Sequence, residues 1–217
     1  MYSPDGSWGA KESVKRRHEG LSPAALALAT DVGRFRRSCH DPPSVLDIGC
    51  GVGHILDAFG HQGYSTYGIE PSTDVAFEVH RRLLEIPPGE RYDVVILHHV
   101  LEHLAMPFEM LHTAAAAVHH GGVVVVGVPA VDSLPEHGNF RYVLNGTHHL
   151  CAFSLACLQR AFRRCGFGHF QVLDRGEASM RLRVLARRSA PTGPPTEDDL
   201  ERPFEPFKSR GTTAGQS

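Results

Sequence analysis

Short apolar runs alternate with segments of helical periodicity along the middle of the chain. Strands that alternate with helices are typical of an α/β fold whose sheet is covered on both faces. The run at 123–128 contains only valine and glycine, as expected of a central strand buried on both faces. We therefore predict strands at 44–48, 64–69, 94–97 and 123–128, and helices at 22–38, 54–59, 107–118 and 154–165.

The last predicted helix is followed by Gly166, and glycine commonly ends a helix. Two further apolar runs, at 169–173 and 181–186, have the length of strands. Because a short loop joins them, we predict that they pair as an antiparallel hairpin.

The two ends of the chain differ in composition from its middle. Residues 1–20 are polar and lack periodicity, which predicts a flexible N-terminal segment. Residues 190–217 carry repeated prolines among threonine, acidic residues and glycine, which predicts a disordered tail. One domain, residues 21–189, lies between them.

Composition narrows the class of protein. The chain has 217 residues, enough for one domain with a sizeable core, and its net charge of -2 argues against a nucleic-acid partner. No apolar run approaches the roughly 18 residues that cross a bilayer, and the N-terminus lacks the apolar block of a signal peptide. Five cysteines without CxxC spacing indicate reduced thiols. We expect a soluble cytoplasmic protein with no membrane partner, and its oligomeric state stays open.

The first strand runs into a glycine-rich turn, in which residues 47–53 read DIGCGVG. Glycines after a strand allow a ligand to approach the backbone without clashes with Cβ atoms. A dinucleotide site requires G-x-G-x-x-G, and here His54 occupies the sixth position, so that pattern fails. The pattern G-x-G-x-G after Asp47 is typical of S-adenosylmethionine (SAM) sites. The alternative is an ordinary strand-to-helix turn.

Glu70 closes the second predicted strand, seventeen residues beyond Gly53. A carboxylate at such a strand end can accept hydrogen bonds from both hydroxyls of a ribose. An adenine would then lie beside Ile69 and Pro71. The alternative is a solvated glutamate without a ligand.

These motifs resemble the class I SAM-dependent methyltransferases, in particular the branch typified by ubiquinone-biosynthesis O-methyltransferases. The resemblance covers residues 42–188 and implies a Rossmann-like, doubly wound, seven-stranded sheet with an antiparallel C-terminal hairpin. It also implies that Asp47, Gly49, Cys50, Gly51 and Gly53 shape the pocket for the cofactor SAM, and that Glu70 holds its ribose. The blocks that carry it are VLDIGCGVG (45–53), YGIEPS (67–72), YDVVILHHVLEHL (92–104), GGVVVVGVPAVDSL (121–134) and HLCAFSLACLQRAFRRCGF (149–167).

One segment departs from this family. Only twenty-two residues separate Glu70 from Asp93, and they must hold a helix, the third strand and its loop. Family members have a longer segment and an acidic residue after the third strand. Here the strand candidate is 77–83, the acidic position falls near Leu83, and Glu85 is the nearest carboxylate. This shortening leaves a non-catalytic SAM-binding module as the alternative function.

His98 and His99 follow the strand at 94–97, and open α/β sheets bind ligands at the carboxyl ends of their strands. Methyl transfer requires alignment of donor and acceptor, and a neutral histidine can remove the proton of a hydroxyl acceptor near pH 7. We predict His99 as a catalytic base and His98 as a wall beside the cofactor. His149, in the HLCAFS block, is a second candidate base. The alternative is that these histidines are structural.

His99, Glu102 and His103 also have the composition of a metal site. Ubiquinone O-methyltransferases carry a Glu-x-x-Glu-His metal motif here, and His99 replaces its first glutamate, which would favour softer metals than magnesium. The alternative, that Glu102 and His103 brace the start of a helix, is preferred. We therefore assign no metal from the sequence, and metal binding by His99, Glu102 and His103 stays open.

The acceptor is the least determined feature. Long loops at the carboxyl edge carry specificity, so residues 130–148 and the N-terminal helix should cover the acceptor pocket. Phe140, Arg141 and Tyr142 could contact an aromatic or sugar-like molecule. We predict O-methylation of a secondary metabolite, quinone-like or sugar. A nicotinamide-dependent oxidoreductase is disfavoured by the failed glycine pattern.

Overall fold

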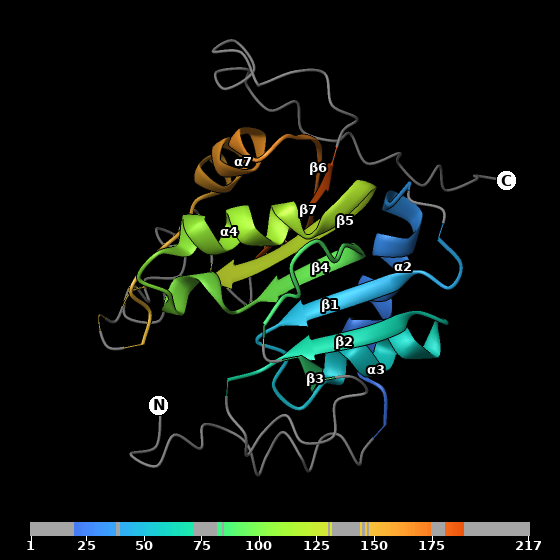
Figure 1. Ribbon diagram of the computed structural model, residues 1–217. Helices are drawn as coiled ribbons and strands as arrows, with labels where there is room; N and C mark the ends of the chain where they lie inside the picture. Colours follow the sequence, from blue (N-terminus) through green and yellow to red (C-terminus); the bar gives the residue numbers. More distant parts are fainter. Residues whose placement is uncertain are drawn as a thin grey trace, which may run out of the picture.

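The computed structural model describes residues 20–37, 40–71, 82–83, 85–129, 131, 144, 146, 148–174 and 181–188. Within them helices alternate with strands, as the apolar pattern predicts (Figure 1). Every described helix is too short or too polar to cross a lipid bilayer. The elements are α2 (Pro23–Phe35), β1 (Ser44–Ile48), α3 (His54–His61), β2 (Ser65–Ile69), β3 (Arg82–Leu83), β4 (Tyr92–His98), the 3-10 turn η1 (Leu101–His103), α4 (Pro107–Ala116), β5 (Val118–Pro129), α7 (Leu155–Arg164), β6 (Phe167–Asp174) and β7 (Arg181–Arg188).

The described strands form one sheet in the order β3-β2-β1-β4-β5-β7-β6. Neighbours from β3 to β5 are parallel, whereas β7 is antiparallel to both β5 and β6. The chain therefore reverses its direction of travel across the sheet between β1 and β4, the usual place for a ligand in a doubly wound fold. The predicted Rossmann-like fold with an antiparallel C-terminal pair is confirmed. Six strands are full length, and β3 comprises only two residues.

Alternate residues of the central strands supply two separate cores, because successive side chains of a strand point to opposite faces. On one face, Val45 of β1 and Val94 of β4 pack with α2 and α3. On the other face, Leu46 and Val95 pack with α4 and α7. The sheet is therefore covered on both faces, as predicted (Figure 1).

Helix α2 begins as predicted but ends early. Ser22 is its N-cap and accepts a hydrogen bond from the backbone of Ala25. The helix ends at Phe35, because Arg36 has extended backbone. The predicted end, Ser38, lies outside the described residues.

The boundary between α4 and β5 also differs from the prediction. The helix ends at Ala116, and Val118 is the first residue of β5, paired with Tyr92 of β4. Including Val118 in the helix was therefore wrong. Val118 is fully buried, and an apolar residue after an alanine run has the same pattern in a helix and in a buried strand.

The third strand falls at the end of the predicted segment. β3 pairs in parallel with β2, with Leu83 opposite Ile69. Residues 72–81, including most of the predicted strand at 77–83, lie outside the described residues, as do residues 1–19 and the predicted tail at 190–217. Phe140, Arg141 and Tyr142 also lie outside, so their predicted contacts stay predictions.

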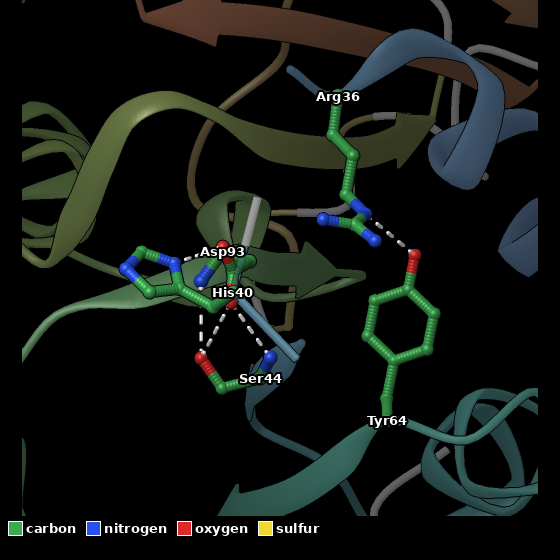
Figure 2. A network of polar contacts seen from close by, with 5 residues as sticks. All are labelled: Arg36, His40, Ser44, Tyr64 and Asp93. Atoms are coloured by element: carbon green, nitrogen blue, oxygen red, sulfur yellow. Dashed lines mark hydrogen bonds and ion pairs between the residues drawn. The ribbon is translucent and has the colours of Figure 1, made fainter. Parts of the chain in front are cut away.

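A buried carboxylate organises the amino edge of the sheet (Figure 2). Asp93 of β4, whose side chain is 1% exposed, lies with Oδ1 2.7 Å from Nδ1 of His40. Its Oδ2 accepts hydrogen bonds from the N–H and the hydroxyl of Ser44, at 2.8 and 3.1 Å. Beside it, Arg36 donates to the hydroxyl of Tyr64 at 3.1 Å. Both oxygens of Asp93 have partners, so this carboxylate fastens the connection between α2 and β1 to the sheet.

Candidate functional site

The chain turns sharply after β1, at the carboxyl edge of the sheet. Gly49, Gly51 and Gly53 have φ angles of 74°, 52° and 83°, which residues with side chains rarely adopt. The N–H groups of Gly49 and Cys50 both donate to the carbonyl of Ile69, at 2.7 and 3.1 Å. The turn is therefore fastened to the end of β2, and Gly53 caps the start of α3.

Two of these glycines have different surroundings. A Cβ on Gly49 would lie 2.6 Å from Cγ2 of Val100, in the segment that follows β4, so a side chain does not fit there. A Cβ on Gly51 would meet no described atom within 4 Å. Gly51 therefore leaves open space beside its backbone, as a closely approaching ligand requires.

Two carboxylates lie at this turn. Glu70 follows β2, and its Oε2 accepts the N–H of Gly51 at 3.0 Å. Asp47 is 2% exposed, and its Oδ1 has no hydrogen-bond partner among the described residues. Burial raises the pKa of Asp47 to about 8, and the negative charge of Glu70 adds to the rise. A buried oxygen without a partner costs about 1–3 kcal/mol, so Asp47 is an acceptor available to a ligand.

These features fit the cofactor that the motifs imply. The open side of Gly51 admits a ligand to the backbone, and the unpartnered oxygen of Asp47 suits a cationic group such as an amine. The fold brings the predicted cofactor residues to one edge of the sheet: Asp47, Gly49, Cys50, Gly51, Gly53, Ile69, Glu70 and Pro71.

The neighbouring strand β4 ends at His98, which lies opposite Gly127 of β5. A Cβ on Gly127 would lie 2.6 Å from Cδ2 of His98, so the imidazole rests directly on the glycine. His99 follows with φ of 58°, and its N–H donates to the carbonyl of Gly127 at 2.8 Å. A left-handed backbone is unfavourable for histidine by about 1–3 kcal/mol and clusters at functional sites.

A buried glutamate orients the ring of His99. Oε1 of Glu102, a residue with no exposed surface, lies 2.9 Å from Nδ1 of His99. A carboxylate accepts the Nδ1–H, so Nε2 keeps its lone pair and can accept a proton. The predicted base is thus held in one tautomer by Glu102.

A second segment lies against η1. The backbone carbonyl of Glu102 accepts the N–H of Leu150 at 2.7 Å. Nδ1 of His103 lies 2.7 Å from the carbonyl oxygen of His148, and the rings of His103 and His149 are 4.9 Å apart. His149, the second candidate base, is therefore brought beside Glu102 and His103, although it comes from a distant part of the sequence.

One group of described side chains has the geometry of a metal site. Ligand atoms of Glu102, His103 and His149 lie within 4.8 Å of one another. Oε2 of Glu102 has no hydrogen-bond partner among the described residues. His103 donates its Nδ1–H to a backbone carbonyl, which leaves Nε2 for an ion. One carboxylate and two imidazoles fit Zn²⁺ or a similar transition metal better than Mg²⁺.

This group differs from the set considered from the sequence. His99 and His103 do not share a helical face, because His99 has a left-handed backbone and only Leu101–His103 form a short 3-10 turn. The ring nitrogen Nδ1 of His99 contacts Glu102, so His99 acts as a neighbour of the group. Glu102 and His103 lie within η1 and not at the start of α4, which begins four residues later at Pro107.

Sequence reasoning missed two contributors to the site. Gly127 lies against the imidazole of His98, and its carbonyl accepts the N–H of His99. Val100 leaves no room for a side chain at position 49. The signal for Gly127 is a single glycine within a run of valines, a pattern that by itself indicates only a buried strand. Val100 carries no signal, because a valine after a strand is common and its contact with Gly49 depends on the fold.

Residues 21–171 match the methyltransferase domain family. The chain belongs to this family. The matched region includes the glycine turn, Glu70, the histidines after β4 and His149. The predicted membership of the class I SAM-dependent methyltransferases is confirmed.

The matches to similar proteins cover only part of each relative's length. A ubiquinone biosynthesis O-methyltransferase of Bradyrhizobium sp. (strain ORS 278) is 28% identical over 140 residues, 55% of either chain. A tRNA U34 carboxymethyltransferase of Hahella chejuensis is 28% identical over 156 residues, 63% of this chain and 48% of that protein. The chain thus spans about half the length of the curated relatives it matches. A magnesium protoporphyrin IX methyltransferase of Synechocystis PCC 6803, solved with bound SAH, has the same fold (TM-score 0.57, 18% identity, 76% and 81% of the two chains).

Proposed function

We propose that the chain binds SAM at the glycine turn and transfers its methyl group to an oxygen of a small molecule. The observation that supports this proposal is that the glycine turn and the candidate base follow neighbouring strands of the sheet. Asp47 and Glu70 lie at the open glycine turn after β1, and His99 lies at the end of the adjacent strand β4. A donor and an acceptor held at these two strand ends would meet at the carboxyl edge of the sheet.

Each residue of the proposed site has a separate role in binding the cofactor or in methyl transfer. When bound, SAM supplies an electrophilic methyl group on a sulfonium whose sulfur leaves as a neutral thioether. Glu70 would hold ribose hydroxyls, and Asp47 would attract the cationic methionine part. His99 would take the proton of the acceptor hydroxyl on Nε2 while the oxygen bonds to the methyl carbon. Glu102 stabilises the resulting imidazolium through Nδ1.

The metal group is a separate part of the same edge. Glu102, His103 and His149 would hold a divalent ion, which would lower the pKa of a bound hydroxyl and orient the acceptor. His149 would then act on the acceptor through the ion, whereas the prediction from sequence has it as a base. Either role places His149 on the acceptor side of the site.

A small acceptor with a quinol, phenol or sugar hydroxyl fits the proposal. The O-methyltransferase name of the Bradyrhizobium relative supports oxygen as the methylated atom. The net charge of -2 favours a small molecule over a nucleic acid, although one relative is named for tRNA. A non-catalytic module is less well supported, because it would have no use for the unfavourable backbone and the buried glutamate of His99.

The first test is calorimetric titration of the protein with SAM and with SAH. We expect micromolar dissociation constants, about -8 kcal/mol, and a loss of binding in Glu70→Gln. Glu109→Gln, on the exposed face of α4, is the matched control and should bind normally. Equal affinity in the two variants would contradict the assigned site, and tighter binding of a nicotinamide cofactor would revive the oxidoreductase alternative.

The second test separates chemistry from binding. His99→Ala should keep the affinity for SAM and lower kcat for a phenolic acceptor by about 10²–10⁴-fold. His61→Ala, at the exposed end of α3, should leave kcat unchanged. A His99→Ala enzyme with normal kcat would remove the proposed base, and tight SAM binding without product from any acceptor would favour the non-catalytic module.

A further inference from the structure

A groove runs between α4 and α7, away from the glycine turn. Its volume is about 500 Å³, within the range of small-ligand and peptide sites. Leu111 and Ala161 are buried at its floor, and Phe108, an aromatic residue that is 52% exposed, stands at its rim. Such an exposed aromatic side chain beside an apolar floor is typical of a surface that binds a chain segment.

The groove carries positive charge. Arg160 and Arg164 of α7 lie one turn apart and both line the groove, and His112 of α4 lines it as well. Like charges at this spacing repel by about 0.2–0.5 kcal/mol. Neither arginine has an ion pair within the described residues, and α7 contains no acidic residue. The groove therefore favours an occupant that is both apolar and acidic.

The chain itself contains a segment of that composition. Residues 197–207 read EDDLERPFEPF, with five acidic residues and only one basic residue. Leu200, Phe204 and Phe207 supply the apolar side chains. The segment lies outside the described residues, so its complementarity to the groove is one of composition.

The chain that leads to residues 197–207 leaves β7 beside the groove, near the C-terminal ends of α4 and α7. Arg188, the last described residue, pairs with Phe167, two residues after the groove residue Cys165. Arg188 also donates to the carbonyls of Ala115, in the last turn of α4, and of Val118, the first residue of β5, at 2.8 and 2.9 Å. From there α7 runs about 15 Å back to Ser154. Residues 189–196 can extend over about 25 Å, so the acidic segment can reach any point of the groove.

We propose that residues 197–207, within the tail that composition predicts as disordered, dock in the groove between α4 and α7 of their own chain. The acidic side chains pair with Arg160 and Arg164, and a phenylalanine enters beside Phe108. This contact covers the groove and holds α4 to α7 next to the segment that carries His149. It is independent of the methyl-transfer proposal.

Two native thiols report on the contact, because Cys157 and Cys165 line the groove. In the full chain, their alkylation rates by iodoacetamide are measured by peptide mass spectrometry, with Cys151, outside the groove lining, as internal reference. We expect Phe204→Ala/Phe207→Ala, and the charge reversal Glu197→Lys/Asp198→Lys/Asp199→Lys, to raise both rates at least fivefold relative to Cys151. These variants leave the groove residues intact, so the effect does not come from a changed thiol environment.

The decisive experiment is a charge exchange. Arg160→Glu/Arg164→Glu should release Cys165 in the same way, and its combination with the reversed segment should restore slow alkylation of Cys165. Cys157 is not compared in these variants, because Arg160 lowers its pKa. Hydrogen exchange of residues 197–207 should show protection in the native chain and in the exchanged variant only. Unchanged rates in the variants of the segment would overturn the proposal. Protection that falls on dilution would overturn it as well, because the segment of a second copy would then be the occupant.

Discussion

Both edges of the sheet contain buried carboxylates, one at the amino edge and two at the carboxyl edge, and these groups differ in their hydrogen bonding. At the amino edge, both oxygens of Asp93 have hydrogen-bond partners (Figure 2). At the carboxyl edge, Oδ1 of Asp47 and Oε2 of Glu102 have none among the described residues. A buried carboxylate oxygen without a partner is destabilising, so we propose that a ligand completes these two oxygens. On this proposal Asp93 is a structural carboxylate, whereas Asp47 and Glu102 belong to the binding site.

The backbone repeats this contrast. Glycines with positive φ occur at both edges, for example Gly51 after β1 and Gly63 before β2, but His99 at the carboxyl edge is the one described residue with a side chain that has a positive φ. Each such angle at a residue with a side chain costs about 1–3 kcal/mol. The amino-edge network uses ordinary backbone at Asp93 and Ser44. Unfavourable conformation and unpartnered acceptors therefore occur together, at the edge where cofactor and acceptor are proposed to bind.

The largest expected effect comes from the structural carboxylate. Asp93→Asn removes the charged acceptor of His40 and turns an amide donor toward the donors of Ser44. We expect a loss of about 3 kcal/mol in the free energy of unfolding, measured with urea, and an unchanged affinity for SAM. A stable Asp93→Asn protein with weakened SAM binding would reverse the assignment of the two edges.

The second effect concerns two glycines that share a conformation. Gly51 and Gly63 both have positive φ and no described atom near a built Cβ, but only Gly51 lies in the site. Alanine at either position should lower the unfolding free energy by about 1–2 kcal/mol. Only Gly51→Ala should also weaken SAM binding, by tenfold or more in calorimetry. Equal SAM affinity in the two variants would show that the open space beside Gly51 is not used.

The third effect is a pH dependence of SAM binding. Because the pKa of Asp47 is raised to about 8, this carboxyl is mostly protonated at pH 7 in the free protein. A cationic ligand binds the ionised form, so affinity should rise from pH 6 to 8, by up to about tenfold per unit, and level off above. Calorimetry in buffers of different ionisation enthalpy should detect release of a proton below pH 8. Binding that is independent of pH in this range would exclude direct pairing with Asp47.

The smallest effect is at the exposed end of the amino-edge network. The side chain of His40 is 54% exposed, so its contact with Asp93 is weakened by solvent. His40→Ala should lower the unfolding free energy by about 0.5–1 kcal/mol, against no change in His61→Ala. A loss as large as that of Asp93→Asn would mean that His40, and not Ser44, is the main partner of Asp93.

The sequence predicts the fold and the cofactor half of the site, around the glycine turn and Glu70, because both depend on local patterns. Alternating apolar runs define the strands, and the spacing from the glycines to Glu70 follows from one strand–helix–strand unit. The group of Glu102, His103 and His149 could not be predicted, since it requires the hydrogen bond from Leu150 to the carbonyl of Glu102. The predicted end of α4 was wrong for a similar reason. The pairing of β5 with β4 decides where the helix stops.

The most direct measurement compares Asp47→Asn with Asp93→Asn, two isosteric changes of buried carboxylates. Because the pKa of Asp47 is raised to about 8, its folded form binds a proton more tightly than the unfolded chain, and wild type loses stability relative to Asp47→Asn as pH rises to 8. We therefore predict that Asp47→Asn is at least as stable as wild type at pH 8 but binds SAM about tenfold more weakly. An Asp47→Asn protein that is as destabilised as Asp93→Asn, with unchanged SAM affinity, would contradict the division between a structural edge and a functional edge.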